Sequence, residues 1–226
     1  MVEVFSQGNR NPENNETERY SLRSLRELGL ENEQDLSDYH RLLVHPLNIE
    51  HFANPPRDPQ DLRQRLIRDN THAYLSDNML GQTLFGGGIN DAAESEHDHF
   101  LVKVVVDPDF QGRGRNPDFR GESTGRQGLV MLIEEAFTTL TNDGRERIKL
   151  DAAVIRHVNN WDRMPRLLIS LGFRPVSILL DQVDVFIQRE ARRVRKPTER
   201  WELRREDWRA LRQLQAIHQI LQGRPI

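Results

Sequence analysis

Apolar residues recur at intervals of three and four in several parts of the chain, which is the pattern of an amphipathic helix. One such stripe begins near Glu31 and is broken at Pro46, and Asp58-Pro59 begins another because proline is favoured at the first helical position. We expect helices over these ranges: Glu31 to Phe52, Asp58 to Asp69, Gly125 to Leu140, Asp162 to Leu171 and Thr198 to Leu221.

Runs of β-branched and aromatic residues between turn signals predict strands. The run from His99 to Val106 is apolar on both faces, so we expect a central strand there. Gly86-Gly87-Gly88 lies inside another strand and predicts a bulge or a close backbone approach. The expected strands are Arg19 to Leu25, Thr71 to Leu75, Leu80 to Ile89, His99 to Val106, Arg147 to Ile155, and a final hairpin of Val176 to Leu180 with Val183 to Gln188.

Composition narrows the class of protein. The 226 residues are 36% hydrophobic and 30% charged, which is typical of a polar globular protein with one main domain. No apolar stretch approaches the roughly 20 residues of a membrane span, and the start lacks the pattern of a signal peptide. The absence of cysteine excludes disulfides, a thiolate nucleophile and Cys-ligated zinc. We therefore expect a cytoplasmic protein.

The last part of the chain is rich in arginine, although the formal net charge of the whole is −3. Such a helix can meet nucleic acid or an acidic partner, or it can simply have a solvated face that bonds to its own carboxylates. A sequence pI near 6.3 argues against nucleic acid. The apolar stripe that includes Trp201 and Trp208 is expected to pack on its own domain or to form a homodimer.

The stretch from Val104 to Phe137 joins a strand, a glycine-rich loop and a helix. The first amides of a helix lack intrahelical partners and carry partial positive charge, while glycines let a phosphate approach the backbone. This order of pieces therefore predicts an anion site. The loop is unusual because two near-copies, DPDFQGRGR and NPDFRGEST, follow each other within it.

The segments VVVDPDFQGRG, GRQGLVMLIEEAF, RIKLDAAVI and RLLISLGF occur in this order, and together they resemble the GNAT superfamily of acetyl-CoA-dependent N-acetyltransferases. The resemblance covers about Thr71 to Gln188. It implies an α/β (α+β) fold with a mixed, mostly antiparallel central sheet flanked by helices. We accordingly divide the chain into a disordered lead-in (1–18), a GNAT-like acetyltransferase domain (19–190) and a basic amphipathic C-terminal helix (191–226).

By this resemblance, acetyl-CoA is the co-substrate, and its pyrophosphate lies on backbone amides of the loop and of the helix that follows. Either copy of the doubled loop can supply these amides: the first has the strand behind it, and the second has the helix ahead of it. We favour a composite of the two, in which residues 115–124 bulge out. The cofactor-binding residues that we expect are Val104, Val105, Val106, Gln111, Gly112, Arg113, Gly114, Gly125, Arg126 and Asn160.

The catalytic side chains are harder to assign. Phe100, Val102 and Leu168 occupy positions where the family often has a Glu, a His or a Tyr that transfers protons, and none of the three can do so. A proton could instead leave through Asp98 or His99, which at the end of a hairpin can equally be solvated polar residues. A backbone amide at Val104 or Val105 is expected to stabilise the oxyanion.

The resulting hypothesis is transfer of an acetyl group from acetyl-CoA to a primary amine of a small molecule or peptide, in a ternary complex. We expect no metal, because His97 and His99 have no further ligands at useful spacing. The alternative is a catalytically silent acyl-CoA-binding module with a regulatory or assembly role. A third hypothesis, a nucleic-acid-binding protein that uses the C-terminal helix, has the least support.

Overall fold

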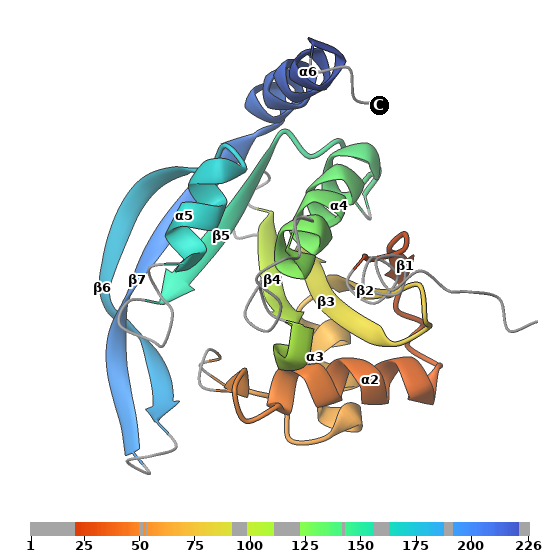
Figure 1. Ribbon diagram of the computed structural model, residues 1–226. Coiled ribbons are helices and arrows are strands. Elements are labelled where there is room, and N and C mark those ends of the chain that lie inside the picture. Colours follow the sequence, from red (N-terminus) through yellow and green to blue (C-terminus); the bar gives the residue numbers. More distant parts are fainter. Residues whose placement is uncertain are drawn as a thin grey trace, which may run out of the picture.

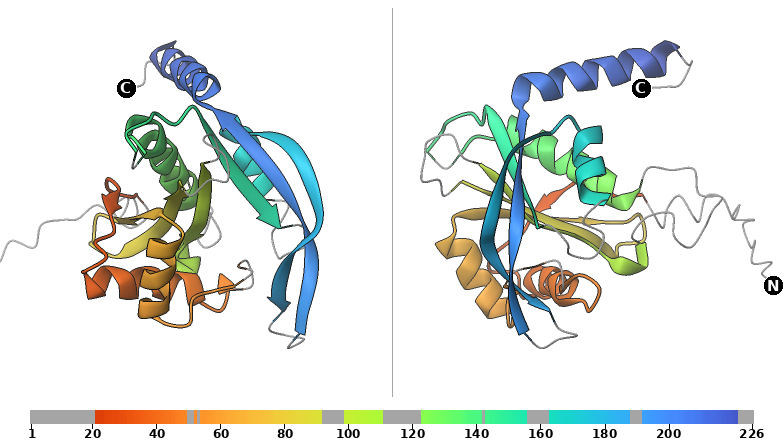
Figure 2. Two further views of the ribbon diagram at one scale, coloured as in Figure 1. Left: turned by 180° about the vertical axis from the view of Figure 1, so that it is seen from behind. Right: turned by 90° about the vertical axis from the view of Figure 1, so that its left-hand side faces the viewer.

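A seven-stranded sheet runs through the protein, with helices on both faces (Figures 1 and 2). The computed structural model describes residues 21–49, 52, 54–91, 99–110, 123–141, 143–155, 163–187 and 192–221. The strand order is β1-β2-β3-β4-β5-β7-β6. The strands are β1 (Arg26–Glu27), β2 (Thr71–Asp77), β3 (Thr83–Asn90), β4 (Phe100–Val106), β5 (Lys149–Ile155), β6 (Arg174–Ile187) and β7 (Arg192–Arg204).

Only β4 and β5 pair in parallel, whereas the other neighbouring strands are antiparallel. The helices are α2 (Glu33–Val44), α3 (Pro59–Arg68), α4 (Thr124–Thr138), α5 (Arg163–Ser170) and α6 (Arg205–Leu221), with a short 3₁₀ helix η2 (Pro108–Phe110) after β4. The expected mixed, mostly antiparallel sheet flanked by helices is confirmed.

Each face of the sheet has its own hydrophobic core. Helices α2 and α3 cover β2–β4 on one face, where Leu36, Tyr39 and Leu62 are fully buried. Helices α4 and α5 cover the other face, where Leu132 and Leu168 belong to a second core that also includes Trp208 of α6 (Figure 2). We call these two sides the α2 face and the α4 face.

Local sequence signals explain the first two helices. The side chain of Asn32 accepts hydrogen bonds from the amides of Gln34 and Asp35 at the start of α2. Asp58 caps α3 in the same way, and Pro59 follows at the first helical position, as predicted. Helix α2 ends at Val44, two residues before Pro46, so the predicted break at Pro46 is confirmed and the helix does not reach Phe52.

The glycine run of β3 permits close packing on both faces. A Cβ at Gly86 would lie 2.6 Å from the ring of Tyr39 in α2, and one at Gly87 would lie 2.8 Å from Leu132 in α4. Alternate residues of a strand point to opposite faces, so two consecutive glycines bring both helices close to the strand. The predicted close backbone approach is thus confirmed. A β-bulge is also present at these glycines, but its extra residue lies in the neighbouring strand β4.

The C-terminal third differs most from the sequence prediction. A hairpin was expected after Val176, but this segment forms a single strand, β6. In place of the expected turn, the pairing register of β6 shifts between Leu179 and Val183, opposite Pro197 of β7. Proline cannot donate to the ladder, which accounts for the interruption. The helix predicted from Thr198 is also wrong, since 192–204 form β7 and α6 begins only at Arg205.

Strand β7 lies between β5 and β6, so part of the segment that we separated as residues 191–226 belongs to the sheet. Trp201 and Leu203 point into the core of the α4 face, while Arg200, Glu202 and Arg204 alternate with them. This period of two was present in the sequence, but the spacing of seven between Trp201 and Trp208 suggested a continuous helix. At the other end, β1 pairs with β2 through Arg26 and Glu27, just beyond the strand expected at Arg19 to Leu25.

Candidate active site

The central feature of the site is the divergence of β4 from β5. Within the described residues, these strands pair at two positions, where the first two residues of β4 face the middle of β5: Phe100 with Asp151 and Leu101 with Ala152. The amide of Asp151 also donates to the carbonyl of His99 at 2.7 Å. Beyond this point β5 continues along β7, and β4 turns away from it (Figure 1). The sheet therefore opens between the carboxyl halves of its two central strands.

A β-bulge lies in β4 beside this opening. Gly86 pairs with Val105 and Gly88 with Val102, so Lys103 and Val104 together oppose the single residue Gly87. Lys103 has φ of 51°, a left-handed conformation that is rare for a lysine. The bulge therefore lies at Val104, one of the two residues expected to supply a backbone amide to the oxyanion.

The bulge also changes which side chains face each core. Leu101 and Val104, three residues apart, both pack on the α4 face, and Val105 packs on the α2 face. A regular strand would place residues three apart on opposite faces. The side chain of Lys103 is directed to the α2 face, where its Nζ lies 3.9 Å from Asp69, and burial lowers its pKa although the Asp69 carboxylate opposes the shift.

The N-terminus of α4 lies against the end of β4. A Cβ at Gly125 would be 3.3 Å from a methyl group of Val106, which shows how close the first turn comes to the strand. Ser123 caps the helix, and its Oγ accepts from the amide of Arg126 at 3.3 Å. Gly125 is the second residue of α4, in the first turn where backbone amides lack intrahelical partners and the helix dipole favours an anion, and Arg126 follows it with its amide on the Ser123 cap.

The chain that leaves β4 is held firmly. The carboxylate of Asp107 pairs with Arg41 of α2 at 2.9 Å, and it also accepts from the amide of Asp109 at 3.0 Å. Asn48 donates to the carbonyl of Val106 at 3.0 Å. A polar hollow of about 380 Å³ adjoins this turn, on the β3 side of β4 and therefore away from the opening. Its lining includes Asp38, Arg41, Thr83, Asp107 and Phe110.

His99 belongs to a buried polar cluster at the opposite, closed end of the two central strands, where β4 pairs with β5. Its Nδ1 lies 2.9 Å from the carboxylate of Asp91, and Asp91 also accepts from Nε of Arg147 at 2.8 Å. Arg147 donates further to the carbonyls of Ala136 and Thr139. The side chains of Asp91, His99 and Arg147 are 3%, 6% and 1% exposed.

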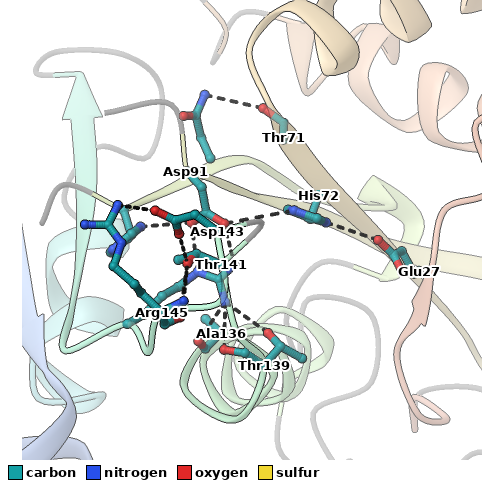
Figure 3. A network of polar contacts seen from close by, with 12 residues as sticks. Glu27, Thr71, His72, Asp91, Ala136, Thr139, Thr141, Asp143 and Arg145 are labelled. Atoms are coloured by element: carbon teal, nitrogen blue, oxygen red, sulfur yellow. Dashed lines mark hydrogen bonds and ion pairs between the residues drawn. The ribbon is translucent and has the colours of Figure 1, made fainter. Parts of the chain in front are cut away.

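The charge of Asp91 is stabilised by this cluster. Burial alone would raise the pKa of Asp91, but the hydrogen bonds from Arg147 and His99 outweigh burial and lower the pKa to about 2. His72 extends the cluster toward the surface, because its Nε2 lies 4.0 Å from Asp91 and its Nδ1 lies 3.2 Å from Glu27 (Figure 3). The cluster joins the end of β3 to the beginnings of β4 and β5.

A second polar group lies on the side of β5 opposite its core-facing residues. Asp151 is fully buried and accepts from Nε and Nη2 of Arg200 at 3.1 and 3.0 Å, with Lys149 at 3.4 Å. The guanidinium of Arg200 lies over the ring of Phe100, 5.4 Å from its centroid. Asp151 is thus neutralised by cations from two strands.

The structure places some of the predicted site residues together. Val104, Val105, Val106, Gly125 and Arg126 gather at the bulge and the adjoining helix N-terminus, whereas His99 lies at the closed end. The predicted residues Asp98, Gln111, Gly112, Arg113, Gly114 and Asn160 lie outside the described residues.

Three residues that take part in this geometry were missed by the sequence analysis. Asp91 follows a strand in a polar stretch, Arg147 begins an expected strand, and neither these residues nor Lys103 carry a local signal of the contacts or of the left-handed conformation found here. Leu168, at the position where the family often has Tyr, is only 2% exposed and belongs to the core. The described residues include no cluster of three or more His, Asp or Glu side chains able to hold a metal ion.

No helix among the described residues has both the length and the apolar character that crossing a bilayer requires. No protein-family profile matches the sequence, and no curated protein has a sequence that is significantly similar to it.

The fold of this chain is nevertheless similar to the folds of solved structures. Spermidine N-acetyltransferase from Vibrio cholerae, in complex with CoA and spermine, aligns with a TM-score of 0.59 at 14% identity over 82% of this chain and 96% of its own. A probable GNAT-family acetyltransferase from Chromobacterium violaceum aligns with a TM-score of 0.57 at 15% identity, over 81% and 88% of the two chains. An N-acetyltransferase from Staphylococcus aureus Mu50 gives 0.56 at 15% identity, over 80% and 96%. The chain therefore has the GNAT acetyltransferase fold.

Proposed function

We propose that this protein transfers an acetyl group from acetyl-CoA to a primary amine by direct attack of the amine within a ternary complex. The observation that carries the proposal is the β4 bulge at Lys103 and Val104, located where β4 departs from β5 and next to the N-terminus of α4. Oxyanion stabilisation requires a fixed backbone donor, and phosphate binding requires amides at a helix start. The fold brings both to one place.

The coenzyme is bound by the carboxyl end of β4 and the first turn of α4. Its pyrophosphate lies on the amide of Gly125 at the start of α4, with the positive end of the helix dipole beneath it. The side chain of Arg126 adds a formal positive charge. The predicted loop residues 111–114 and Asn160 complete this half of the site.

The chemistry needs few side chains. The amine nitrogen forms a bond to the thioester carbonyl carbon, the carbonyl electrons move to oxygen, and the tetrahedral species collapses as the C–S bond breaks and the thiolate leaves. A backbone amide at the bulge, that of Val104 or Val105, stabilises the oxyanion. A thiol with a pKa near 8.5 is a tolerable leaving group without an acid at Leu168. The ammonium proton leaves through water toward Asp98, since His99 is buried and its Nδ1 faces Asp91 at the closed end of the strands.

The acceptor is a small molecule or peptide that carries a primary amine. The likeness to a spermidine N-acetyltransferase structure that contains CoA and spermine supports a small amine acceptor. The reaction requires no metal, and we place it in the cytoplasm. The apolar stripe of α6, in which Leu214 is 64% exposed, supports a homodimer through that helix.

The alternative is an acyl-CoA-binding module without catalysis. The observation in its favour is that Phe100, Val102 and Leu168 leave the usual proton-transfer positions without an acid or base. Both functions require coenzyme binding, so turnover is the measurement that separates them.

The first experiment measures CoA affinity by calorimetry and thiol release from acetyl-CoA with a panel of polyamines, amino acids, aminoglycosides and peptides. We expect Arg126→Glu to weaken CoA binding by at least about tenfold, since it replaces a favourable charge at the helix start with an unfavourable one. Arg209→Glu, on the exposed side of α6, is the matched control. Equal CoA affinity of the two variants would show that Arg126 does not take part in coenzyme binding. CoA binding without thiol release on any amine would favour the silent module.

A further inference from the structure

The peptide that joins Lys103 to Val104 is held in an uncommon conformation. Among the described residues, Lys103 and Asn70 are the non-glycine residues with positive φ. Asparagine tolerates this region, but a lysine adopts it only where the surrounding structure enforces it. The contacts of Lys103 therefore show what holds the bulge in place.

The main contact comes from Tyr39 of α2. Its hydroxyl donates a hydrogen bond to the carbonyl oxygen of Lys103 at 3.0 Å, across 64 residues of sequence. The side chain of Tyr39 is completely buried in the core of the α2 face. Its ring fits there only because position 86 is a glycine, where a Cβ would lie 2.6 Å from two ring carbons. The fold thus provides a specific place for this phenol.

A hydrogen bond to the carbonyl also orients the next amide. In a trans peptide the C=O of one residue and the N–H of the next point in opposite directions. When Tyr39 holds the Lys103 carbonyl toward the α2 face, the N–H of Val104 is directed away from that face. Val104 is one of the two residues that we assign to the oxyanion.

We infer that Tyr39 is a positioning residue of the reaction: its hydroxyl holds the bulged peptide so that the Val104 amide remains oriented as an oxyanion donor. This inference rests on the proposed acetyl transfer. Tyr39 does not touch the reacting atoms, and it acts through the main chain of Lys103.

Two properties suit Tyr39 to this role. Burial raises the pKa of its phenol far above the ordinary value, so the hydroxyl remains protonated, and therefore a donor, at neutral pH. The ring is wedged between α2 and β3, so the position of the hydroxyl is set by packing and not by solvent. Because the hydroxyl stays protonated and packing holds the ring, Tyr39 provides a constant orientation of the bulged peptide.

The test compares Tyr39→Phe with Tyr74→Phe. Phenylalanine fills the same space and removes only the hydroxyl. Tyr74 is a buried tyrosine on β2 that packs in the other core, so its variant controls for the loss of a buried phenol. Removal of an oxyanion donor costs about 10²- to 10³-fold in kcat, so a loosened donor is expected to cost about ten- to a hundredfold.

We expect Tyr39→Phe to lower kcat by this factor while KM for acetyl-CoA, affinity for CoA and Tm follow the values of Tyr74→Phe. A kcat within about threefold of Tyr74→Phe would overturn the inference, because the difference would be too small for a displaced oxyanion donor.

Hydrogen exchange of the Val104 amide, followed by NMR in the CoA complex, separates failure of the inference from failure of the proposed function. Faster exchange in Tyr39→Phe than in Tyr74→Phe is expected whether or not an acceptor has been found. Equal exchange rates in the two variants would overturn the positioning role of Tyr39. If exchange is faster in Tyr39→Phe but the wild type turns over no amine, Tyr39 still positions the Val104 amide and the enzyme assignment is refuted.

Discussion

Replacement of Asp91 by asparagine removes the negative charge between Arg147 and His99. At pH 7 the variant would leave the guanidinium of Arg147, only 1% exposed, without its counter-ion. Loss of one partner of a buried pair typically costs about 3–5 kcal/mol of unfolding free energy. Arg147 keeps its bonds to Ala136 and Thr139, so we expect the lower end of this range, about 3 kcal/mol.

The pKa of Asp91 gives an independent value for the contribution of its charge to the free energy of unfolding. The pKa of Asp91 falls from an ordinary 3.8 to about 2 in the folded protein. A carboxyl group whose folded pKa is depressed stabilises the fold above its unfolded pKa, and this stability is lost as pH falls through the folded pKa. One pKa unit corresponds to about 1.4 kcal/mol, so the contribution of Asp91 is about 2 kcal/mol, present above about pH 4 and lost toward about pH 2.

The assay is urea unfolding followed by circular dichroism, at pH values from 7 down to the lowest at which both proteins fold. We expect the difference between wild type and Asp91→Asn to be about 3 kcal/mol at pH 7 and to narrow below about pH 4. Asp143→Asn is the control, because this aspartate forms an exposed pair with Arg145 and its urea midpoint should remain that of the wild type. A difference below about 1 kcal/mol at pH 7, or one that does not narrow with acid, would refute the reasoning.

Three further predictions concern packing, proton transfer and assembly. Gly128→Ala would place a Cβ between 2.1 and 2.5 Å from ring atoms of Phe85, and we expect a loss of about 1–3 kcal/mol in urea unfolding, with an unchanged midpoint as the contrary result. His99→Gln should cost about 1.5–3 kcal/mol of stability through its bond to the ionised Asp91. If His99 also carries the proton, kcat falls as well, and if only the stability changes, His99 is structural. Leu214→Glu on the exposed stripe of α6 should lower the dimer fraction in sedimentation, and a mass that is monomeric in the wild type would exclude the dimer.

Local signals made several elements predictable from the sequence. Asp58-Pro59 marked the start of α3, the apolar run marked β4, and the periodicity after Gly125 marked α4. The order of strand, glycine-rich loop and helix was enough to locate a helix start at the end of β4. These features depend on residues close in sequence, so the sequence carries them directly.

Features that depend on distant residues were not predictable. Strand β7 forms because Trp201 and Leu203 can enter the core beside β5, and this contact outweighed the helical spacing of the same residues. Asp91 and Arg147 meet across 56 positions, and nothing near either one indicates the other.

The sequence by itself therefore determined the local order from which an anion site is predicted: a strand, a glycine-rich turn and a helix start. The tertiary structure alone decided how β4 is bent, because the bulge at Lys103 needs Gly87 opposite it and Tyr39 from α2 beneath it. The physical reason is that capping and periodicity act within a few residues, whereas the register of a sheet and the packing against it are set by the whole fold.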